Sequence, residues 1–169
     1  MTNKSLFPRC SGKGFFFEDM SDIKNYVKVS DDIATSGQPG RGEFAQIAKE
    51  GYAAVVNLAT GTSPDAIPDE GDVTSDSGMT YYHIPVVWTA PEISDLERFF
   101  SVMDDLRGGK VWVHCVVNKR ASAFVYLYRL LSLGVTEDEA RAPMDEVWEP
   151  DGIWRGFIEL AKDIYLPGR

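Results

Sequence analysis

Residues 111–133 constrain the fold more than any other part of the chain. They open with a short β-branched and aromatic run, continue through a turn, and end in a long segment with apolar residues at helical spacing. This segment begins at Arg120 and is apolar on almost every side, through residues such as Phe124 and Leu127. A helix that is hydrophobic all round is normally buried. We therefore expect a strand, a tight loop and a helix that runs through the middle of a domain.

The rest of the chain alternates strand-like and helix-like segments. The expected strands are 26–29, 33–35, 53–58, 80–87 and 110–114, and the first two form a hairpin. The expected helices are 41–50, a weak helix over 69–77, 94–107 with a capping box at Ser94 and Glu97, 120–133, and two more that begin near Thr136 and Asp151. This order predicts an α/β fold, in which a mainly parallel central sheet is flanked by helices on both faces and preceded by an N-terminal β-hairpin.

Composition and charge narrow the classes of protein and partner. With 169 residues, 44% of them hydrophobic, we expect one domain over residues 1–169. Cys10 and Cys115 stand far apart in unlike contexts, which argues against a disulfide framework or a metal cluster, and no cofactor is expected. Residues 1–8 lack the apolar core of a signal peptide and no stretch approaches a membrane span, so we expect a cytoplasmic protein. The net charge of −9 disfavours nucleic acid and anionic membrane surfaces as partners.

The loop after His114 has the composition of an anion site built around a thiolate. Cys115 follows a strand, and the junction between loop and helix directs backbone N–H groups and the positive end of the helix dipole at one point. Asn118 tolerates left-handed backbone better than most residues, so we expect it to supply a positive φ. The expected phosphate-binding residues are Val116, Val117, Asn118, Lys119 and Arg120, with phosphate or sulfate in the loop. These parts predict phosphoryl transfer through a covalent cysteine intermediate.

Residues 111–122 resemble the signature loop of the cysteine-based protein tyrosine and dual-specificity phosphatases. In that family a strand ends in His-Cys, and Arg closes the loop at the start of the central helix. Five residues usually separate Cys from Arg, whereas four separate them here, which resembles a bacterial branch with the loop H-C-x-x-N/G-x-R. Ser36-Gly37-Gln38-Pro39 and residues 54–58 are similar to further patterns of that branch, so the resemblance covers roughly residues 27–133.

The resemblance implies roles for individual residues. Cys115 would attack phosphorus, the loop N–H groups and Arg120 would stabilise the phosphoryl oxygens, and His114 would fix the loop through side-chain hydrogen bonds. The family normally has Ser or Thr directly after the Arg, where its hydroxyl assists the departing thiolate. This chain has Ala121 there and Ser122 one residue later, so Ser122 is the candidate supporting hydroxyl. Binding of phosphate is therefore better supported than turnover.

Cleavage of a phosphate monoester also needs a proton for the leaving oxygen, which in these families comes from an Asp on the loop after the preceding strand. Glu92 lies in the matching segment beside a proline and is the first candidate. Asp95 lies in the first turn of a predicted helix, whose dipole would favour its ionised form. Asp65 and Asp69, after the strand 53–58, are the other candidates. Each of these acids, taken alone, is typical of a surface carboxylate.

Other residues of the site have structural interpretations that compete with the catalytic ones. Most isolated cysteines are small buried hydrophobes, and a lone Arg120 or Lys119 would be an ordinary surface charge. His83, inside a predicted strand, is expected to pack rather than to catalyse. The combined strand, loop and helix favour a nucleophilic Cys115 and an anion-binding Arg120.

Three functions fit this pattern. The first is a cysteine-dependent phosphatase acting on a phosphorylated protein, including phosphotyrosine, or on a phosphorylated small molecule. The second is a catalytically weak module that binds a phosphorylated partner. The third is a sulfurtransferase that carries a persulfide on Cys115, although the position of Arg120 and the Ser-Gly-Gln-Pro pattern favour phosphate. Selectivity among phosphate esters depends on the depth and rim of the pocket. The oligomeric state depends on the surface of the folded protein. The sequence alone therefore predicts neither the substrate nor the oligomeric state.

Overall fold

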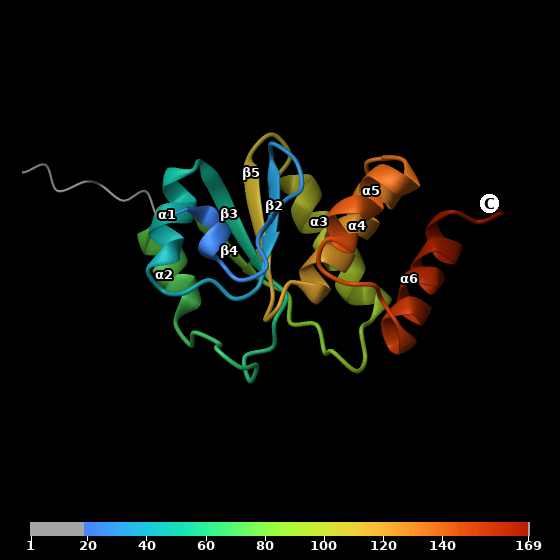
Figure 1. Cartoon of the computed structure of the whole chain (residues 1–169), viewed down its shortest axis with the longest axis horizontal. Helices are drawn as coiled ribbons and strands as arrows, with labels where there is room; N and C mark the ends of the chain where they lie inside the picture. Colours follow the sequence, from blue (N-terminus) through green and yellow to red (C-terminus); the bar gives the residue numbers. More distant parts are fainter. Residues whose placement is uncertain (1–18, 169) are drawn as a thin grey trace, which may run out of the picture.

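The computed structural model describes residues 19–168, so Cys10 and residues 1–8, on which two of the expectations rest, lie outside the described residues. A five-stranded sheet with the order β1-β2-β5-β3-β4 forms the centre (Figure 1). Its strands are β1 (Val27–Lys28), β2 (Ile33–Ser36), β3 (Tyr52–Asn57), β4 (Thr80–His83) and β5 (Lys110–His114). β1 is antiparallel to β2, and all other neighbours are parallel. The predicted hairpin and the mainly parallel sheet are confirmed.

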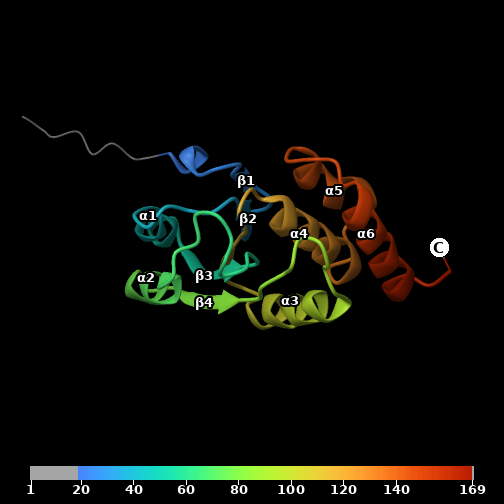
Figure 2. The ribbon, with the colours of Figure 1, turned by 90° about the horizontal axis from the view of Figure 1, so that it is seen from below.

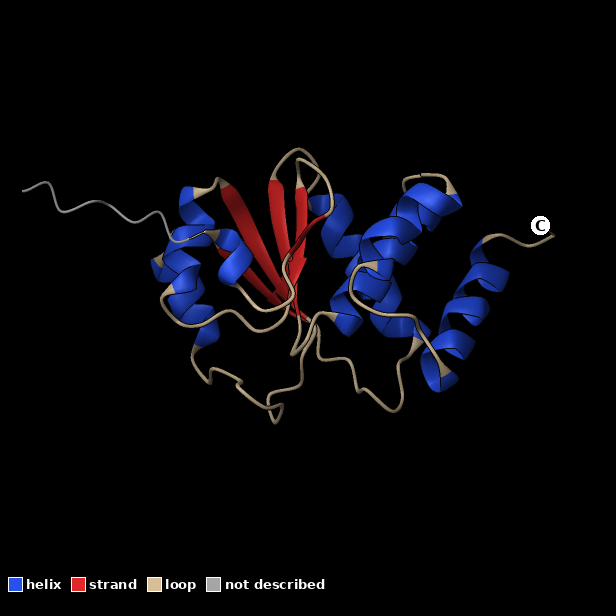
Figure 3. Ribbon diagram, in the orientation of Figure 1, coloured by secondary structure: helices blue, strands red, loops and turns tan. Residues whose placement is uncertain are grey.

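Helices cover both faces of this sheet. After a short 3-10 helix at Met20–Asp22 come α1 (Glu43–Lys49), α2 (Glu70–Asp76), α3 (Ile93–Asp105), α4 (Lys119–Leu131), α5 (Glu137–Asp145) and α6 (Gly152–Tyr165). Figures 2 and 3 show α1 and α2 on one side of the sheet and α3 to α6 on the other. The predicted α/β class is therefore confirmed. No helix in the described part of the chain is long and apolar enough to cross a membrane.

Successive side chains along the central strands belong alternately to two hydrophobic cores, one on each face of the sheet. Trp112 and Val55 pack with the residues of α1, whereas Val113 and Val56 pack with α3 and α4. This is the period of two expected of strands, because successive side chains point to opposite faces. Nearly every side chain from Arg120 to Leu130 is buried in α4, as the apolar sequence predicts. The larger core thus encloses the helix that carries the candidate site at its N-terminus.

Two predicted element boundaries are wrong. The strand predicted over 80–87 ends at His83, because His83 pairs with Asn57, the last residue of β3. The N–H groups of Ile84 and Val86 still donate to the backbone oxygens of Asn57 and Leu58. The capping box at Ser94 is absent. α3 begins at Ile93 after Glu92, and the Ser94 hydroxyl donates to the Glu92 carboxylate at 3.2 Å.

Candidate active site

Residues 115–120, which are the loop between β5 and α4 and the first two residues of α4, are called here the signature loop. It follows the carboxyl end of a central strand, where open parallel sheets place their ligand sites. Asn118 has φ +70°, so the predicted left-handed residue is confirmed. Its side chain is buried and donates to the backbone oxygen of Asn25 at 2.6 Å and to the Thr35 hydroxyl at 3.1 Å. Asn118 therefore fixes the conformation of the loop through its positive φ and through the hydrogen bonds of its side-chain amide.

The segment directly after β2 forms backbone contacts with the signature loop. The backbone N–H of Gln38 donates to the oxygen of Val116 at 3.1 Å, and Gly37 forms an isolated bridge with Val117. The Asn25 side chain donates to the oxygen of Val117 at 3.1 Å. The Gly-Gln part of the Ser-Gly-Gln-Pro pattern therefore contacts the signature loop directly.

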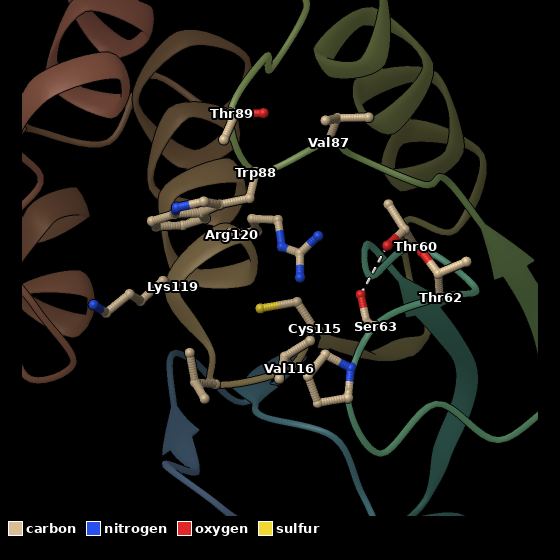
Figure 4. A pocket seen from close by; sticks show the side chains of 12 residues that line it. Thr60, Thr62, Ser63, Val87, Trp88, Thr89, Cys115, Val116, Lys119 and Arg120 are labelled. Atoms are coloured by element: carbon tan, nitrogen blue, oxygen red, sulfur yellow. Dashed lines mark hydrogen bonds between the residues drawn. The ribbon is translucent and has the colours of Figure 1, made fainter.

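Cys115 and Arg120 face one cavity of about 720 Å³ (Figure 4). The Cys115 thiol lies beside the Arg120 guanidinium, and a segment after β3 closes the opposite wall. The exposed fractions are 1% for Cys115 and 6% for Arg120, so both groups are reached only through this cavity. Its lining residues are Thr60, Thr62, Ser63, Pro64, Val87, Trp88, Thr89, Cys115, Val116, Val117, Lys119 and Arg120. Four of the five predicted phosphate-binding residues thus line the cavity, whereas Asn118 is buried and does not line it.

The Arg120 guanidinium is held in place by the chain rather than by a carboxylate. One of its terminal nitrogens donates to the backbone oxygen of Val86 at 2.7 Å. The oxygen is neutral, so the positive charge of Arg120 is not cancelled and its remaining N–H groups can bind an anion. The cavity consequently combines a thiol, a helix N-terminus and a fixed guanidinium.

Tryptophans and a lysine form the rim of the cavity. The Lys119 ammonium lies 5.9 Å from the ring centre of Trp88 and 5.3 Å from that of Trp148. Trp88 also stacks on Trp154 at 5.2 Å, and the Trp154 indole donates to the Trp88 backbone oxygen at 3.0 Å. Trp88 is nevertheless 41% exposed. The rim therefore offers an aromatic face and a second positive charge next to Arg120.

A buried carboxylate that the sequence did not reveal lies behind the signature loop. The Oε1 atom of Glu70 is 2.6 Å from Nε2 of His114, and its Oε2 atom accepts from the Gln38 side chain at 2.7 Å. Burial alone would raise the pKa of Glu70. The hydrogen bond and charge of His114, with the bonds from Gln38 and Tyr81, outweigh burial and leave this pKa below its ordinary value. Glu70 stands in a weakly helical stretch with no motif, so only its burial distinguishes it from a surface acid.

The four predicted proton donors do not meet in the cavity. Within residues 19–168 no Asp or Glu lines it. Glu92 is exposed and accepts a hydrogen bond from Ser94, and Asp69 is exposed and paired with Arg41, which lowers the Asp69 pKa. Asp65 is exposed directly after the cavity-lining Pro64.

Asp95 lies in the first turn of α3, as predicted, and does not line the cavity. Burial raises the pKa of Asp95.

The hydroxyl predicted to support catalysis has other partners. Ser122 donates to the backbone oxygen of Lys119 at 3.1 Å and accepts from the Trp148 indole at 3.1 Å. Ala121 is fully buried in the core that surrounds α4. Ser122 therefore connects Trp148, at the rim of the cavity, to α4 by a hydrogen bond. His83, as expected, makes a structural contact, with Nε2 2.7 Å from the backbone oxygen of Ala59.

Comparison with solved structures finds similar folds in a DUF442 protein and in phosphatases. A candidate phosphatase of the DUF442 family from Shewanella putrefaciens CN-32 superposes with a TM-score of 0.77 at 33% identity, covering 86% of this chain and 95% of that one. Tk-PTP in its active form superposes with a TM-score of 0.67 at 20% identity over 85% of this chain and 97% of that one. TpbA of P. aeruginosa in complex with pTyr gives 0.63 at 17% identity over 85% and 91%. The last two similarities concern the fold alone.

Sequence comparison finds a longer relative. The beta-lactamase hydrolase-like protein of Xylella fastidiosa (strain Temecula1 / ATCC 700964) is 28% identical over 119 residues, which are 69% of this chain. The matched part is 27% of that protein, so this chain corresponds to about a quarter of the curated relative. No family model matches the sequence.

Proposed function

Because the chain belongs to the DUF442 family of phosphatase-like proteins, we propose that it is a cysteine-dependent phosphatase that hydrolyses phosphate monoesters. One observation carries the proposal: the Cys115 thiol and the Arg120 guanidinium face the same cavity at the N-terminus of α4. A nucleophile in such a position lies beside two groups that bind the oxygens of an anion, the helix N-terminus and the guanidinium. A working thiolate needs a reducing compartment, so we propose a cytoplasmic location.

In the proposed reaction the Cys115 thiolate attacks phosphorus, and the bond from phosphorus to the leaving oxygen breaks. Backbone N–H groups of the signature loop and the Arg120 guanidinium stabilise the charge on the three remaining oxygens. Water then attacks the phosphocysteine, releases inorganic phosphate and regenerates the thiolate. All these steps use groups of the chain, the substrate and water.

The leaving oxygen needs a proton, and the rim must supply it. Glu92 remains our proposed donor, because it lies three residues after Thr89, which lines the cavity. Asp65 is the alternative, since it directly follows the lining residue Pro64. Both carboxylates are exposed and stand on segments that border the cavity, whereas Asp69 is held by Arg41.

The rim favours substrates with a flat or anionic group beside the phosphate. Trp88 presents an indole face to the cavity, and Lys119 adds a second cation. Phosphotyrosine in a protein has such a flat group, and small phosphorylated molecules with a second anion also fit. The substrate we propose is therefore a phosphorylated protein or a small phosphate ester of this kind.

Turnover of an aryl phosphate tests the proposal. Wild type is expected to release phenol and phosphate, and Cys115→Ser is expected to lose turnover while still binding inorganic phosphate. The matched control is Ser75→Ala, a change on α2 away from the cavity lining. Equal turnover by wild type and Cys115→Ser would contradict a cysteine nucleophile. Phosphate binding without turnover by wild type would leave the phosphate-binding module.

The cavity lining formed by residues 19–168 contains no carboxylate, which favours sulfur transfer as a second candidate. The Cys115 thiolate would attack the outer sulfur of a thiosulfate, breaking the sulfur–sulfur bond, so that sulfite leaves and Cys115 becomes a persulfide. A thiol or cyanide acceptor would then remove the outer sulfur. Sulfite leaves without needing a proton, which suits a cavity whose described lining has no acid. Thiocyanate formed from thiosulfate and cyanide measures this activity directly.

A further inference from the structure

Glu70 and His114 form a buried pair directly behind the signature loop. His114 is 0% exposed and Glu70 2% exposed, and their Nε2 and Oε1 atoms are 2.6 Å apart. His114 is the last residue of β5 and precedes Cys115, whereas Glu70 is the first residue of α2. A buried carboxylate without partners would be strongly destabilising, and this one has donors on both oxygens.

The hydrogen bonds of the pair use both ring nitrogens and both carboxylate oxygens. Nδ1 of His114 lies 3.3 Å from the backbone oxygen of Cys115, which can only accept, so this bond requires a proton on Nδ1. On the other side of the ring, Nε2 shares a proton with Oε1 of Glu70, whose second oxygen accepts from Gln38. The pair therefore links Cys115 to Gln38 through a continuous series of hydrogen bonds.

We infer that Glu70 is a positioning residue that fixes the orientation of the His114 ring behind Cys115 and holds the signature loop in place through His114 and Gln38. A fixed ring keeps the backbone of Cys115, which accepts from Nδ1, in the position that a bound oxyanion requires. The consequence for turnover rests on the proposed phosphatase function. The consequences for the ring and for oxyanion binding do not.

Glu70 reaches the loop from two sides. Through His114 it acts on the backbone oxygen of Cys115, and through Gln38 it acts on the residue whose N–H bonds to Val116. α2 also begins shortly after the segment that forms the wall of the cavity opposite Cys115. One carboxylate therefore joins the end of β5 to the segment after β2, at the start of the helix that follows this wall. Removing its charge would weaken its bonds to His114 and Gln38.

Nitrogen NMR of the wild-type protein labelled on histidine tests the inference without any variant. The chain has two histidines, His83 and His114, so His83 is an internal reference. The proton between Nε2 of His114 and Glu70 is expected to give a far-downfield signal that is correlated with Nε2 and exchanges slowly with water, because the bond is short and buried. Absence of this signal would overturn the inference whether or not the protein hydrolyses phosphate esters.

A variant tests the link to the loop. Glu70→Gln keeps the size of the side chain and removes its charge, and Asp69→Asn is the matched control on the neighbouring exposed carboxylate. Glu70→Gln should weaken protection of Cys115 from iodoacetamide by inorganic phosphate about tenfold, as expected for the loss of one hydrogen bond to a charged group. Asp69→Asn should leave it unchanged.

A double-mutant cycle separates positioning from general damage. If Glu70 acts through His114, Glu70→Gln should cost much less phosphate protection in a His114→Asn background than in wild type. If turnover is observed, kcat should fall more than KM changes. A folded Glu70→Gln protein with wild-type protection, or equal losses in both backgrounds, would contradict the inference. If the variant does not fold, the NMR measurement on wild type still decides.

Discussion

Gly37 lies so close to Val116 that a Cβ atom at Gly37 would stand 2.7 Å from the Val116 backbone oxygen. Real Cβ atoms do not approach backbone that closely, so only glycine fits here unless the chain moves. The neighbouring Gln38 N–H donates to the same oxygen at 3.1 Å. The position of the signature loop is therefore set by a close backbone contact with a segment nearly eighty residues earlier in the chain.

Gly37→Ala should move the signature loop and weaken the binding of oxyanions to it. The added methyl group would push against the Val116 oxygen and against Lys24, and we expect a loss of about 1–3 kcal/mol in the free energy of unfolding. Urea unfolding measures this loss. Gly42→Ala is the control, because a Cβ at Gly42 meets no atom within 4 Å. Equal stability of the two variants would show that the backbone yields easily at Gly37.

Arg120→Lys should abolish most of the turnover of an aryl phosphate. An ammonium cannot keep the bond to the Val86 oxygen and also make paired contacts to two phosphoryl oxygens. The expected loss in kcat/KM is on the order of 3 kcal/mol, by analogy with the removal of one preorganised donor from an oxyanion site. Arg129→Lys, on the same helix but outside the cavity lining, is the control. Near wild-type kinetics of Arg120→Lys would show that the guanidinium does not bind the phosphoryl group.

Hydrolysis of the phosphocysteine should be slower than its formation. Ala121 supplies no hydroxyl, and the Ser122 hydroxyl already bonds to Lys119 and Trp148. A rapid-mixing experiment should therefore show a burst of phenol followed by slow turnover. Ala121→Ser should speed the slow phase if its hydroxyl reaches the Cys115 sulfur. Turnover without a burst would mean that Ser122 or water already performs this step.

Glu92→Gln should slow the burst with a substrate whose leaving group is poor. It should hardly affect one whose leaving group needs no proton, because the carboxylic acid only donates to the departing oxygen. Asp65→Asn is the parallel variant on the other segment that borders the cavity. The variant whose effect depends on the leaving group identifies the donor. If neither effect depends on it, the proton comes from elsewhere.

Glu70 should make the protein more stable above the pH range in which carboxylates ordinarily titrate than below this range. Burial alone would raise its pKa, but the bonds from His114, Gln38 and Tyr81 lower it below the ordinary 4.5. Its stabilising contribution is therefore complete above pH 4.5 and is lost as the pH falls through the lowered pKa. Glu70→Gln should flatten the acid part of a plot of unfolding free energy against pH, measured by urea titration.

Asp95 provides a control for this measurement, because its substitution should change the free energy of unfolding in the opposite direction. Burial raises its pKa, so its ionisation costs stability as the pH rises. Asp95→Asn should therefore gain stability relative to wild type above pH 4, where Glu70→Gln loses it. The same direction of change for both variants would contradict the assignment of Glu70 as a stabilised carboxylate.

The sequence by itself determined the elements and the local chemistry. The β-branched run of β5, the apolar α4 and the residue types between them predicted the strand, the signature loop and the buried helix. Asn118 was predicted to take a positive φ and has one. These properties depend on hydrophobic period and on the conformational preference of single residues, which neighbours in the chain reveal.

Only the tertiary structure decided what surrounds the cysteine. Glu70 and His114 are 44 residues apart, and nothing local to either residue encodes their contact. It arises because β5 lies between β2 and β3 in the sheet, which brings the end of β5 beside the start of α2. The early end of β4 and the placement of Glu92 outside the cavity likewise depend on which N–H groups and loops meet in space. Periodicity predicts which face of an element is buried, whereas strand order and register determine which residues meet there.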